Sequence, residues 1–362
     1  RHRALERFAI AVVNQTDEAT RDSSFDIEEA LNEALMVGLT PEVAKNHYED
    51  VYDRLMDQED ITGFSTGYPT LDEIIGASEG SFARQTMTLF MGNSGSGKSV
   101  ILLNVARNLA KQGLNVIFFT LELSKKMTEE RLDMMITRQS KTSIYDNAEE
   151  WAPVIEREGL NLGGGTLIIE KFPMSGTTAN HLKKYINEYI TVNGYSPDVI
   201  AIDYLDVMSP NQGDTSDTFK DDKRIAEQVK SMGEEFNAVI ITASQQNREG
   251  IDVVDTSQRH VAGGISKINT VDNAISIIRT DQLIAQGKVL LKAVKVRSGP
   301  GTGESTSLGW VSGEVLITPS DDEISISHLK SSGSKEKGNS GWGDSSSPRN
   351  ALEEFKEFLD IG

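Results

Sequence analysis

The stretch that decides the fold is Met87-Thr88-Leu89-Phe90-Met91-Gly92-Asn93-Ser94-Gly95-Ser96-Gly97-Lys98-Ser99. Its first residues are mostly apolar and typical of a buried strand. Residues 92–99 fit the pattern G-x-x-x-x-G-K-[ST], in which a glycine-rich loop wraps a phosphate chain. The following residues, 100–111, predict a helix. Strand, loop and helix in this order predict a nucleotide-binding α/β domain.

Each part of this loop has an expected role. Glycines allow the backbone N–H groups and the start of the helix to face a phosphate. Lys98 is expected to reach the β- and γ-phosphates, and the Ser99 hydroxyl to bind Mg²⁺. We therefore predict ATP and Mg²⁺ as cofactors. The nucleotide-binding residues are Gly92, Asn93, Ser94, Gly95, Ser96, Gly97, Lys98, Ser99 and Val100.

Outward from the loop, short apolar segments alternate with helical patterns. This alternation is typical of a mostly parallel sheet with flanking helices, and late segments joined by Gly turns predict antiparallel C-terminal strands. We predict that this α/β core domain covers residues 61–320. The predicted strands are 87–91, 116–121, 199–202, 238–243, 274–278, 288–296, 310–311 and 314–317.

The flanking segments differ from this core. Residues 1–60 carry helical patterns and predict a linker or adaptor arm. Residues 321–350 are rich in Ser and Gly and predict a disordered linker. Residues 351–362 form a short acidic amphipathic tail, which is either plain disorder or a docking segment for a partner.

Composition excludes several classes of protein. The 362 residues include no cysteine, so disulfides, thiolate nucleophiles and Cys-ligated zinc are excluded. No apolar stretch has the length of a membrane span, and no apolar signal segment follows the N-terminus, so we expect a cytoplasmic protein without a membrane partner. The net charge of -19 argues against general coating of polyanions. Any nucleic-acid site therefore has to be local.

Polar residues follow three of the predicted strands. Asp203 ends the strand 199–202, and we favour a role in holding Mg²⁺ over a turn or cap. Glu122 follows the strand 116–121 and either accepts a proton from the water that attacks the γ-phosphate or is a solvated strand end. Gln245 either senses the γ-phosphate or caps its strand.

Two cations, Lys295 and Arg297, lie on one face of a late strand by its period of two. An arginine there could stabilise developing phosphate charge if the nucleotide of a neighbouring subunit is near. An ion pair at a strand edge is the other interpretation.

In their order along the chain these motifs resemble the DnaB family of hexameric replicative helicases, within the RecA-like ATPases. The resemblance covers about residues 61–318, and it is closest to the helicases of T-even-type bacteriophages. The motifs are Thr66-Gly67-Tyr68-Pro69-Thr70-Leu71-Asp72, the phosphate loop, Thr120-Leu121-Glu122-Leu123, Asp203-Tyr204-Leu205, Ser244-Gln245 and Lys295-Val296-Arg297-Ser298-Gly299-Pro300. The resemblance implies a RecA-like P-loop ATPase core.

The resemblance implies a role for several residues within one subunit. Glu122 would be the catalytic base, and Asp203 the carboxylate linked to Mg²⁺. Gln245 would be the sensor that couples the γ-phosphate to the DNA loops. Arg131 matches a family arginine near the nucleotide.

The resemblance also implies contacts beyond a single subunit. Lys295 and Arg297 would form a finger pair that reaches the ATP of the adjacent subunit, which requires a ring. Gly263, Gly264 and Lys267 align with a channel loop that holds DNA, where glycines allow close approach to phosphates and lysine supplies charge. This chain lacks the Arg–Glu pair that bacterial members have before the glycines. A Gly-Gly surface turn is the alternative.

The function that the resemblance implies is an ATP-dependent replicative DNA helicase. It would form a ring, a homo-hexamer in the family, and move 5′ to 3′ on single-stranded DNA to unwind a fork. From the resemblance we expect the helical collar domain of the family to be absent or truncated in this chain, and a phage origin would place the protein in the host cytoplasm. A primase, a single-strand-binding protein or a helicase loader would be separate partners. A filament-forming recombinase of the RecA or RadA type and a non-translocating loader or scaffold are the alternatives.

Overall fold

The computed structural model describes residues 48, 51–52, 63–77, 82–212, 217–245, 265–299 and 301–319. The chain divides into two units, Arg1–Asp60 and Ile61–Gly362, and the elements below belong to the second. Apart from positions 48, 51 and 52, the arm predicted over 1–60 lies outside the described residues, as do the linker 321–350 and the tail 351–362.

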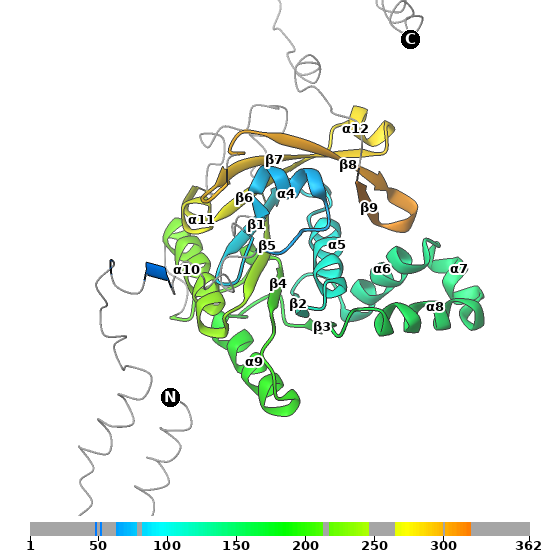
Figure 1. Ribbon diagram of the computed structural model, residues 1–362, viewed down its shortest axis with the longest axis horizontal. Coiled ribbons are helices and arrows are strands. Elements are labelled where there is room, and N and C mark those ends of the chain that lie inside the picture. The colour runs from blue at the N-terminus through cyan, green and yellow to red at the C-terminus, as the bar shows by residue number, and fades with distance from the viewer. Residues whose placement is uncertain are drawn as a thin grey trace, which may run out of the picture. The chain divides into compact units, whose positions relative to one another are not determined.

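The second unit contains a nine-stranded sheet with the order β3-β2-β4-β5-β1-β6-β7-β8-β9 (Figure 1). The strands from β3 to β6 in this order run parallel, and β7, β8 and β9 are added antiparallel. The predicted fold class is confirmed. The strands are β1 (Met87–Gly92), β2 (Asn115–Thr120), β3 (Thr166–Lys171), β4 (Val199–Asp203), β5 (Val239–Gln245), β6 (Asn273–Ile278), β7 (Lys288–Val296), β8 (Ser305–Val311) and β9 (Leu316–Pro319).

Besides small differences at strand ends, three strands differ from the sequence prediction. β3 was not predicted, because it is the edge strand beside β2 and most of its residues are only half-buried. β8 begins at Ser305 instead of Trp310, since its first residues carry hydroxyl side chains and give no apolar signal. β9 begins at Leu316 because Ser312–Glu314 forms a short 3-10 turn, η5.

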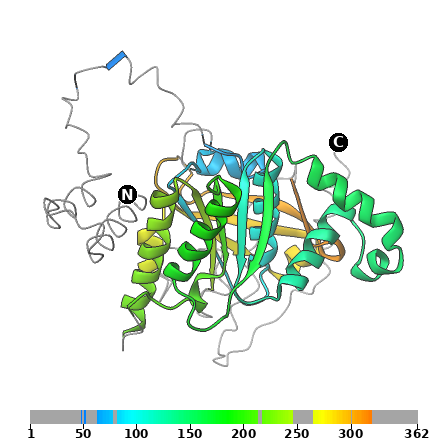
Figure 2. The same ribbon diagram turned by 90° about the horizontal axis from the view of Figure 1, so that it is seen from below.

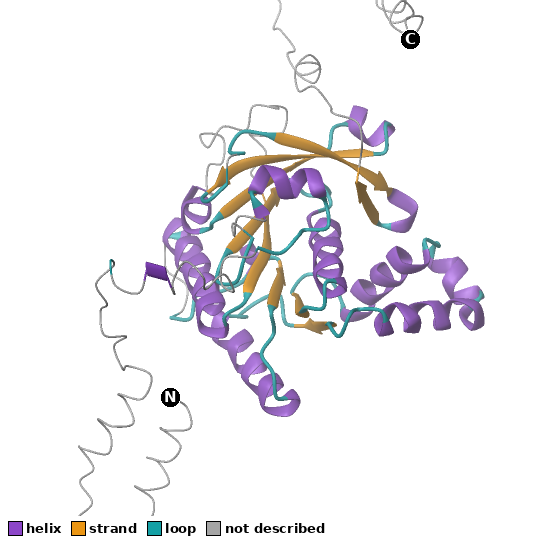
Figure 3. Ribbon diagram, viewed as in Figure 1, coloured by secondary structure: helices purple, strands orange, loops and turns teal. Residues whose placement is uncertain are grey.

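Helices cover both faces of the sheet (Figures 2 and 3). The core under one face includes residues of α4 and α5, and the core under the other includes residues of α9, α10 and α11. None of the described helices combines the length and apolar character needed to cross a bilayer. The helices are α4 (Pro69–Ile75), α5 (Lys98–Lys111), α6 (Lys125–Thr137), α7 (Lys141–Asp146), α8 (Ala148–Leu160), α9 (Ala179–Asn193), α10 (Thr218–Phe236), α11 (Ile265–Thr270), α12 (Asp281–Ala285) and the 3-10 turn η2 (Leu205–Val207).

The central strands alternate between the two cores. In β2, Val116 and Phe118 belong to the core that includes α5, whereas Ile117 and Phe119 belong to the core that includes α9 and α10. A parallel sheet buried on both faces needs apolar side chains at nearly every position, so these strands read as continuous apolar runs. Such strands hold the loops at their carboxyl ends in place, and ligands of open α/β sheets bind at this edge.

The motif at residues 66–72 begins the core domain and is a structural turn. Asp72 Oδ1 accepts hydrogen bonds from the Thr66 N–H at 2.7 Å and from its hydroxyl at 2.6 Å. Tyr68 is buried, and Pro69 starts α4, a position that tolerates its missing N–H. The motif thus closes the turn that leads into α4.

α6, α7 and α8 form a group beside the main body (Figure 1). Neither α7 nor α8 has a buried residue. Glu158 of α8 pairs with two cations of α5, Arg107 and, at 3.0 Å, Lys111. Met135 of α6 reaches the core. Charges and α6 therefore attach this group to the sheet.

Candidate nucleotide site

The phosphate loop lies where β1 ends and α5 begins. Its backbone depends on glycine at two points, because Gly95 and Gly97 have φ of 76° and 91°. A Cβ at Gly97 would also come within 2.2 Å of the Trp310 ring. α5 begins at Lys98, within the last residues of the motif, so its free N-terminal N–H groups face the loop. This arrangement favours a bound phosphate.

Lys98 folds back over the loop. Its ammonium donates hydrogen bonds to the carbonyl oxygens of Gly92 at 3.0 Å and of Asn93 at 2.9 Å. Burial lowers the pKa of Lys98, and the charges of nearby carboxylates act in the opposite direction. These carboxylates are Asp206, Glu122 and Asp203. The lysine charge is thus held at the mouth of the loop.

Asp203 ends β4 beside the loop. It is 1% exposed, and its Oδ1 accepts a hydrogen bond from the Ser99 hydroxyl at 3.0 Å. Burial raises the pKa of Asp203 to about 6, against the effects of the Ser99 hydrogen bond and of Arg131 on α6. The charge of Glu122 adds to the rise. A bound cation would stabilise this buried carboxylate.

The residues present fit Mg²⁺ together with a nucleotide. The Ser99 hydroxyl and the Asp203 carboxylate are oxygen ligands of the kind that Mg²⁺ takes. Asn93 Oδ1 and Ser96 Oγ in the loop are buried without a hydrogen-bond partner, so they mark polar positions that a ligand would satisfy. No group of three or more Asp, Glu, His or Cys in the described residues is arranged to hold a metal alone. Mg²⁺ that is bound largely through substrate phosphates needs no such group.

Glu122 and Lys171 lie at the same edge, after β2 and at the end of β3. Glu122 is exposed, and its charge acts on both Lys98 and Asp203. The Lys171 ammonium donates to the Leu121 carbonyl; burial lowers the pKa of Lys171, and the charges of Asp203 and Glu122 raise it. Lys171 was not predicted from the sequence, because β3 was not predicted. The edge therefore carries a second cation beside Glu122.

Gln245 ends β5 and pairs in register with Gly92, the first residue of the loop. Its backbone N–H donates to Asp206 Oδ2 at 2.8 Å, and its side chain is exposed. Ser244 donates its hydroxyl to Asp206 Oδ1 at 2.8 Å. The structure thus brings Gln245 beside the loop. It is held there by Asp206, which the sequence analysis did not single out.

Lys295 and Arg297 lie at the opposite end of the parallel strands, near the start of β6. Val296 pairs with Asn273, the first residue of β6, and Asn273 pairs with Thr88 near the start of β1. From Thr88 to the loop the strand spans roughly 13 Å. Arg297 therefore lies away from a phosphate bound on its own loop.

The two cations at this edge differ in their contacts. The Lys295 ammonium donates to three carbonyl oxygens at the end of α11, those of Ile268 (2.9 Å), Asn269 (3.0 Å) and Val271 (2.6 Å). Arg297 pairs with Asp272 at 2.9 Å, yet its side chain is 54% exposed. All three of its hydrogen bonds lie within its own chain, and a contact of Lys295 with another subunit stays a prediction. Of the predicted finger pair, Arg297 alone keeps an exposed cation.

Lys267, which was expected to supply charge to a DNA loop, is buried in an ion cluster. It lies on α11 and is 3% exposed, and its ammonium binds the carboxylates of Asp206 and, at 3.1 Å, Asp222. Two carboxylates therefore hold the charge that was expected to face DNA, and a contact of Lys267 with DNA stays a prediction. Gly263 and Gly264 lie outside the described residues.

A cation-π pair beside the loop was also missed. The Arg279 guanidinium lies 4.0 Å from the centre of the Trp310 ring, the ring that limits Gly97. Arg279 Nε is buried without a hydrogen-bond partner, and burial lowers the pKa of Arg279. Arg279 directly follows β6 and Trp310 lies on the antiparallel strand β8, and no local pattern predicts that they meet beside the loop.

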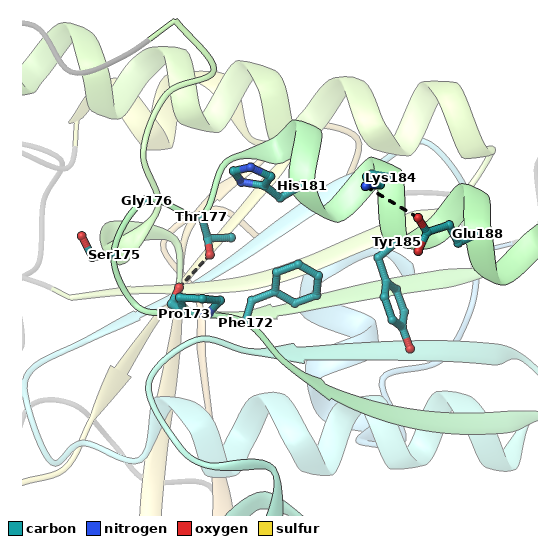
Figure 4. A pocket seen from close by; sticks show the side chains of 9 residues that line it. All are labelled: Phe172, Pro173, Ser175, Gly176, Thr177, His181, Lys184, Tyr185 and Glu188. Atoms are coloured by element: carbon teal, nitrogen blue, oxygen red, sulfur yellow. Dashed lines mark hydrogen bonds and ion pairs between the residues drawn. The ribbon is translucent and has the colours of Figure 1, made fainter.

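A cavity of about 350 Å³ lies elsewhere, at the end of β3 and the start of α9 (Figure 4). Its wall contains Phe172 and Tyr185, whose rings meet edge to face at 5.9 Å, and Thr177, whose hydroxyl donates to the Pro173 carbonyl at 2.7 Å. None of the predicted site residues lines it. The candidate site is thus the sheet edge at the phosphate loop.

Fold and loop together define a RecA-like, P-loop nucleotide-binding domain. The family model of the DnaB-like helicase C-terminal domain matches residues 63–257, which is more than half of the chain. This chain therefore belongs to the DnaB-like helicase family, and the resemblance seen in the sequence is confirmed.

Individual relatives agree with the family match. The chain is 25% identical over 227 residues to a DnaB-like replicative helicase of Enterobacteria phage T4, covering 61% of this chain and 48% of the relative. It thus spans about half the length of that relative.

Two solved structures share the fold. One is an ATPase domain, with 20% identity and a TM-score of 0.64, covering 83% of this chain and 100% of that one. The other is a DnaB-like replicative helicase described with its interactions with primase, with 19% identity and a TM-score of 0.66, covering 87% and 76%.

Proposed function

We propose that this chain is the motor domain of a replicative DNA helicase that hydrolyses ATP and moves on single-stranded DNA. The observation that carries the proposal is the contact between Ser99 and Asp203 at the phosphate loop, in a chain of the DnaB-like family. This contact joins the two groups that hold the metal in phosphoryl-transfer sites of the P-loop class. Movement 5′ to 3′ and unwinding at a fork are proposed from the family resemblance.

The proposed roles within one chain follow from position and charge. Lys98 binds the β- and γ-phosphates, while Ser99 and Asp203 hold Mg²⁺, which when bound neutralises charge on the phosphate oxygens. Glu122 accepts the proton of the attacking water, and its exposure leaves it open to water. Gln245 senses the γ-phosphate from its place beside the loop.

We assign the remaining cation of each site to a neighbouring copy in a ring, a homo-hexamer by resemblance. Arg297 supports this assignment, because it is exposed at the edge away from its own loop. An arginine supplied from outside stabilises charge on the transferring phosphoryl group. Arg131 acts on Asp203 of its own chain and is assigned to the same nucleotide.

ATP hydrolysis with Mg²⁺, measured with and without single-stranded DNA, tests the proposal. Strong stimulation by DNA, abolished in Glu122→Gln, is the expected result. Unwinding of a forked duplex then separates a helicase from a recombinase, and electron micrographs separate rings from filaments. Hydrolysis that ignores DNA would contradict the proposal and favour a loader or scaffold.

DNA contacts and protein partners are part of the same proposal. Gly263 and Gly264 would approach DNA phosphates, since glycine allows close backbone contact. The solved helicase described with primase supports a primase as partner, and a single-strand-binding protein or loader is proposed beside it. Recovery of a partner on the full chain but not on a chain ending at Lys330 would assign the contact to residues beyond that point, including the acidic tail. Equal recovery would discard that role.

A further inference from the structure

An ionic cluster of Asp206, Lys267 and Asp222 joins three elements next to the candidate site. Lys267 of α11 binds Asp206 of η2 and, at 3.1 Å, Asp222 of α10. The Lys267 side chain is 4% exposed, against 23% for Asp206 and 28% for Asp222. A buried ammonium needs such partners, because an unpaired buried charge is strongly destabilising. The cluster therefore fixes α11 to η2 and α10.

Asp206 has a second set of contacts, at the end of β5. Its Oδ1 accepts from the Ser244 hydroxyl, and its Oδ2 accepts from the Gln245 N–H, each at 2.8 Å. Its charge raises the pKa of Lys98 more than either other nearby carboxylate does. One carboxylate thus receives donors from β5 and α11 and also acts on the phosphate loop.

These contacts join the two sides of one stretch of sequence. Gln245 is the last described residue before residues 246–264, and Lys267 lies just after them. Both donate to the carboxylate of Asp206. A displacement of Gln245 or of Lys267 would therefore move Asp206 and, with it, the other donor. In the proposed function, Gln245 faces the γ-phosphate and the stretch between holds the glycines assigned to DNA.

We propose that Asp206 is a positioning residue that couples the state of the nucleotide to DNA binding, through Gln245 on one side and Lys267 on the other. The inference rests on the proposed function. Its basis is that one carboxylate accepts hydrogen bonds from both elements. Buried ion clusters often stabilise a fold no more than apolar packing does, so stability alone does not explain this cluster. Hydrogen bonds to one shared acceptor fix the positions of their donors relative to each other.

The affinity of the full chain for a fluorescein-labelled oligo-dT strand, measured with a non-hydrolysable ATP analogue and with ADP, tests this coupling. Coupled sites commonly differ in affinity by about 5- to 150-fold between such states. We expect a ratio in this range for the wild type and less than about twofold for Asp206→Asn. The DNA-stimulated kcat of the variant should fall while its KM for ATP stays nearly unchanged.

Two further variants sharpen the test. Asp222→Asn is the matched control, since Asp222 binds Lys267 from α10 and not from the turn that holds Gln245; it should keep the wild-type ratio. Ser244→Ala removes one hydrogen bond to Asp206 and should lower the ratio partly. It serves in place of Asp206→Asn if that variant does not fold.

The outcomes distinguish a coupling role of Asp206 from a purely structural one. If the wild type shows a ratio and Asp206→Asn keeps it, with only a lower melting temperature, the cluster is structural and the inference is overturned. An unchanged ratio in Ser244→Ala, where Asp206→Asn does not fold, has the same meaning. If the wild type binds DNA equally in both nucleotide states, the coupling mechanism fails as a whole, and the inference fails with it.

Discussion

The two ends of the parallel strands form two edges of the sheet, and charged residues are arranged differently at each. Where the parallel strands end, Lys98, Asp203 and Glu122 lie close enough to act on one another, and the buried Asp203 is bonded to Ser99. Where they begin, Lys295 is held by carbonyl oxygens and Arg297 extends into solvent. Charged residues at the first edge thus cluster around the phosphate loop, whereas at the other edge Arg297 is exposed to solvent.

The difference teaches how the proposed machinery is divided. One chain supplies the phosphate loop, the metal ligands and the group that activates water. The cation that would stabilise the transferring phosphoryl group lies at the far edge, where the nucleotide of a second copy can meet it. Each prediction below alters one edge, and the results together test this division.

The largest expected effect is at the loop. Lys98→Ala should lower ATP hydrolysis by about 1,000-fold or more, because the cation held at the loop mouth is lost. Phosphate release measures it. Lys183→Ala, which breaks a surface pair with Glu235, is the control and should leave hydrolysis unchanged. Retained hydrolysis in Lys98→Ala would refute the site.

At the far edge, Arg297→Ala should bind nucleotide normally and hydrolyse it about 1,000-fold more slowly. The sharper test mixes this variant with Lys98→Ala. In a mixed ring, the intact loop of one variant meets the intact Arg297 of the other, so mixing should restore part of the activity. Mixed rings that stay inactive would argue against a shared site.

Glu122→Gln tests the water-activating role at the first edge. The amide cannot accept the proton, so single-turnover hydrolysis should fall by about 100- to 1,000-fold. Nucleotide affinity should be retained, and it is measured by equilibrium binding. Weaker binding with unchanged single-turnover hydrolysis would instead assign Glu122 to nucleotide binding.

The smallest effects concern stability at the far edge. Lys295→Met leaves carbonyl groups at the end of α11 without their donor and should lower the free energy of unfolding by about 1–3 kcal/mol. Arg297→Ala removes an ion pair with a half-exposed guanidinium and should cost less than about 1 kcal/mol. Urea unfolding compares them, and the reverse order would contradict the distinction between the two cations.

Local sequence patterns predicted those parts of the fold whose structure depends on a short segment alone. The phosphate loop and the continuous apolar strands β1, β2 and β4 are of this kind, since burial on both faces leaves an unbroken apolar run. β3 was not predicted, because an edge strand is only half-buried and lacks a continuous apolar run. Lys171 was not predicted for the same reason, because it lies beside Glu122 only when β3 pairs with β2.

By itself the sequence determined the class of fold, the loop that binds phosphate and the strand ends at which Asp203, Glu122 and Gln245 follow. Only the tertiary structure decided what each charged side chain does. The ammonium of Lys267 is held by Asp206, 61 residues away, and the ammonium of Lys295 is held by carbonyl groups at the end of α11, so neither contact could be predicted from a local pattern. The physical reason is that backbone period and glycine geometry are local, whereas the role of a charge depends on which groups share its surroundings.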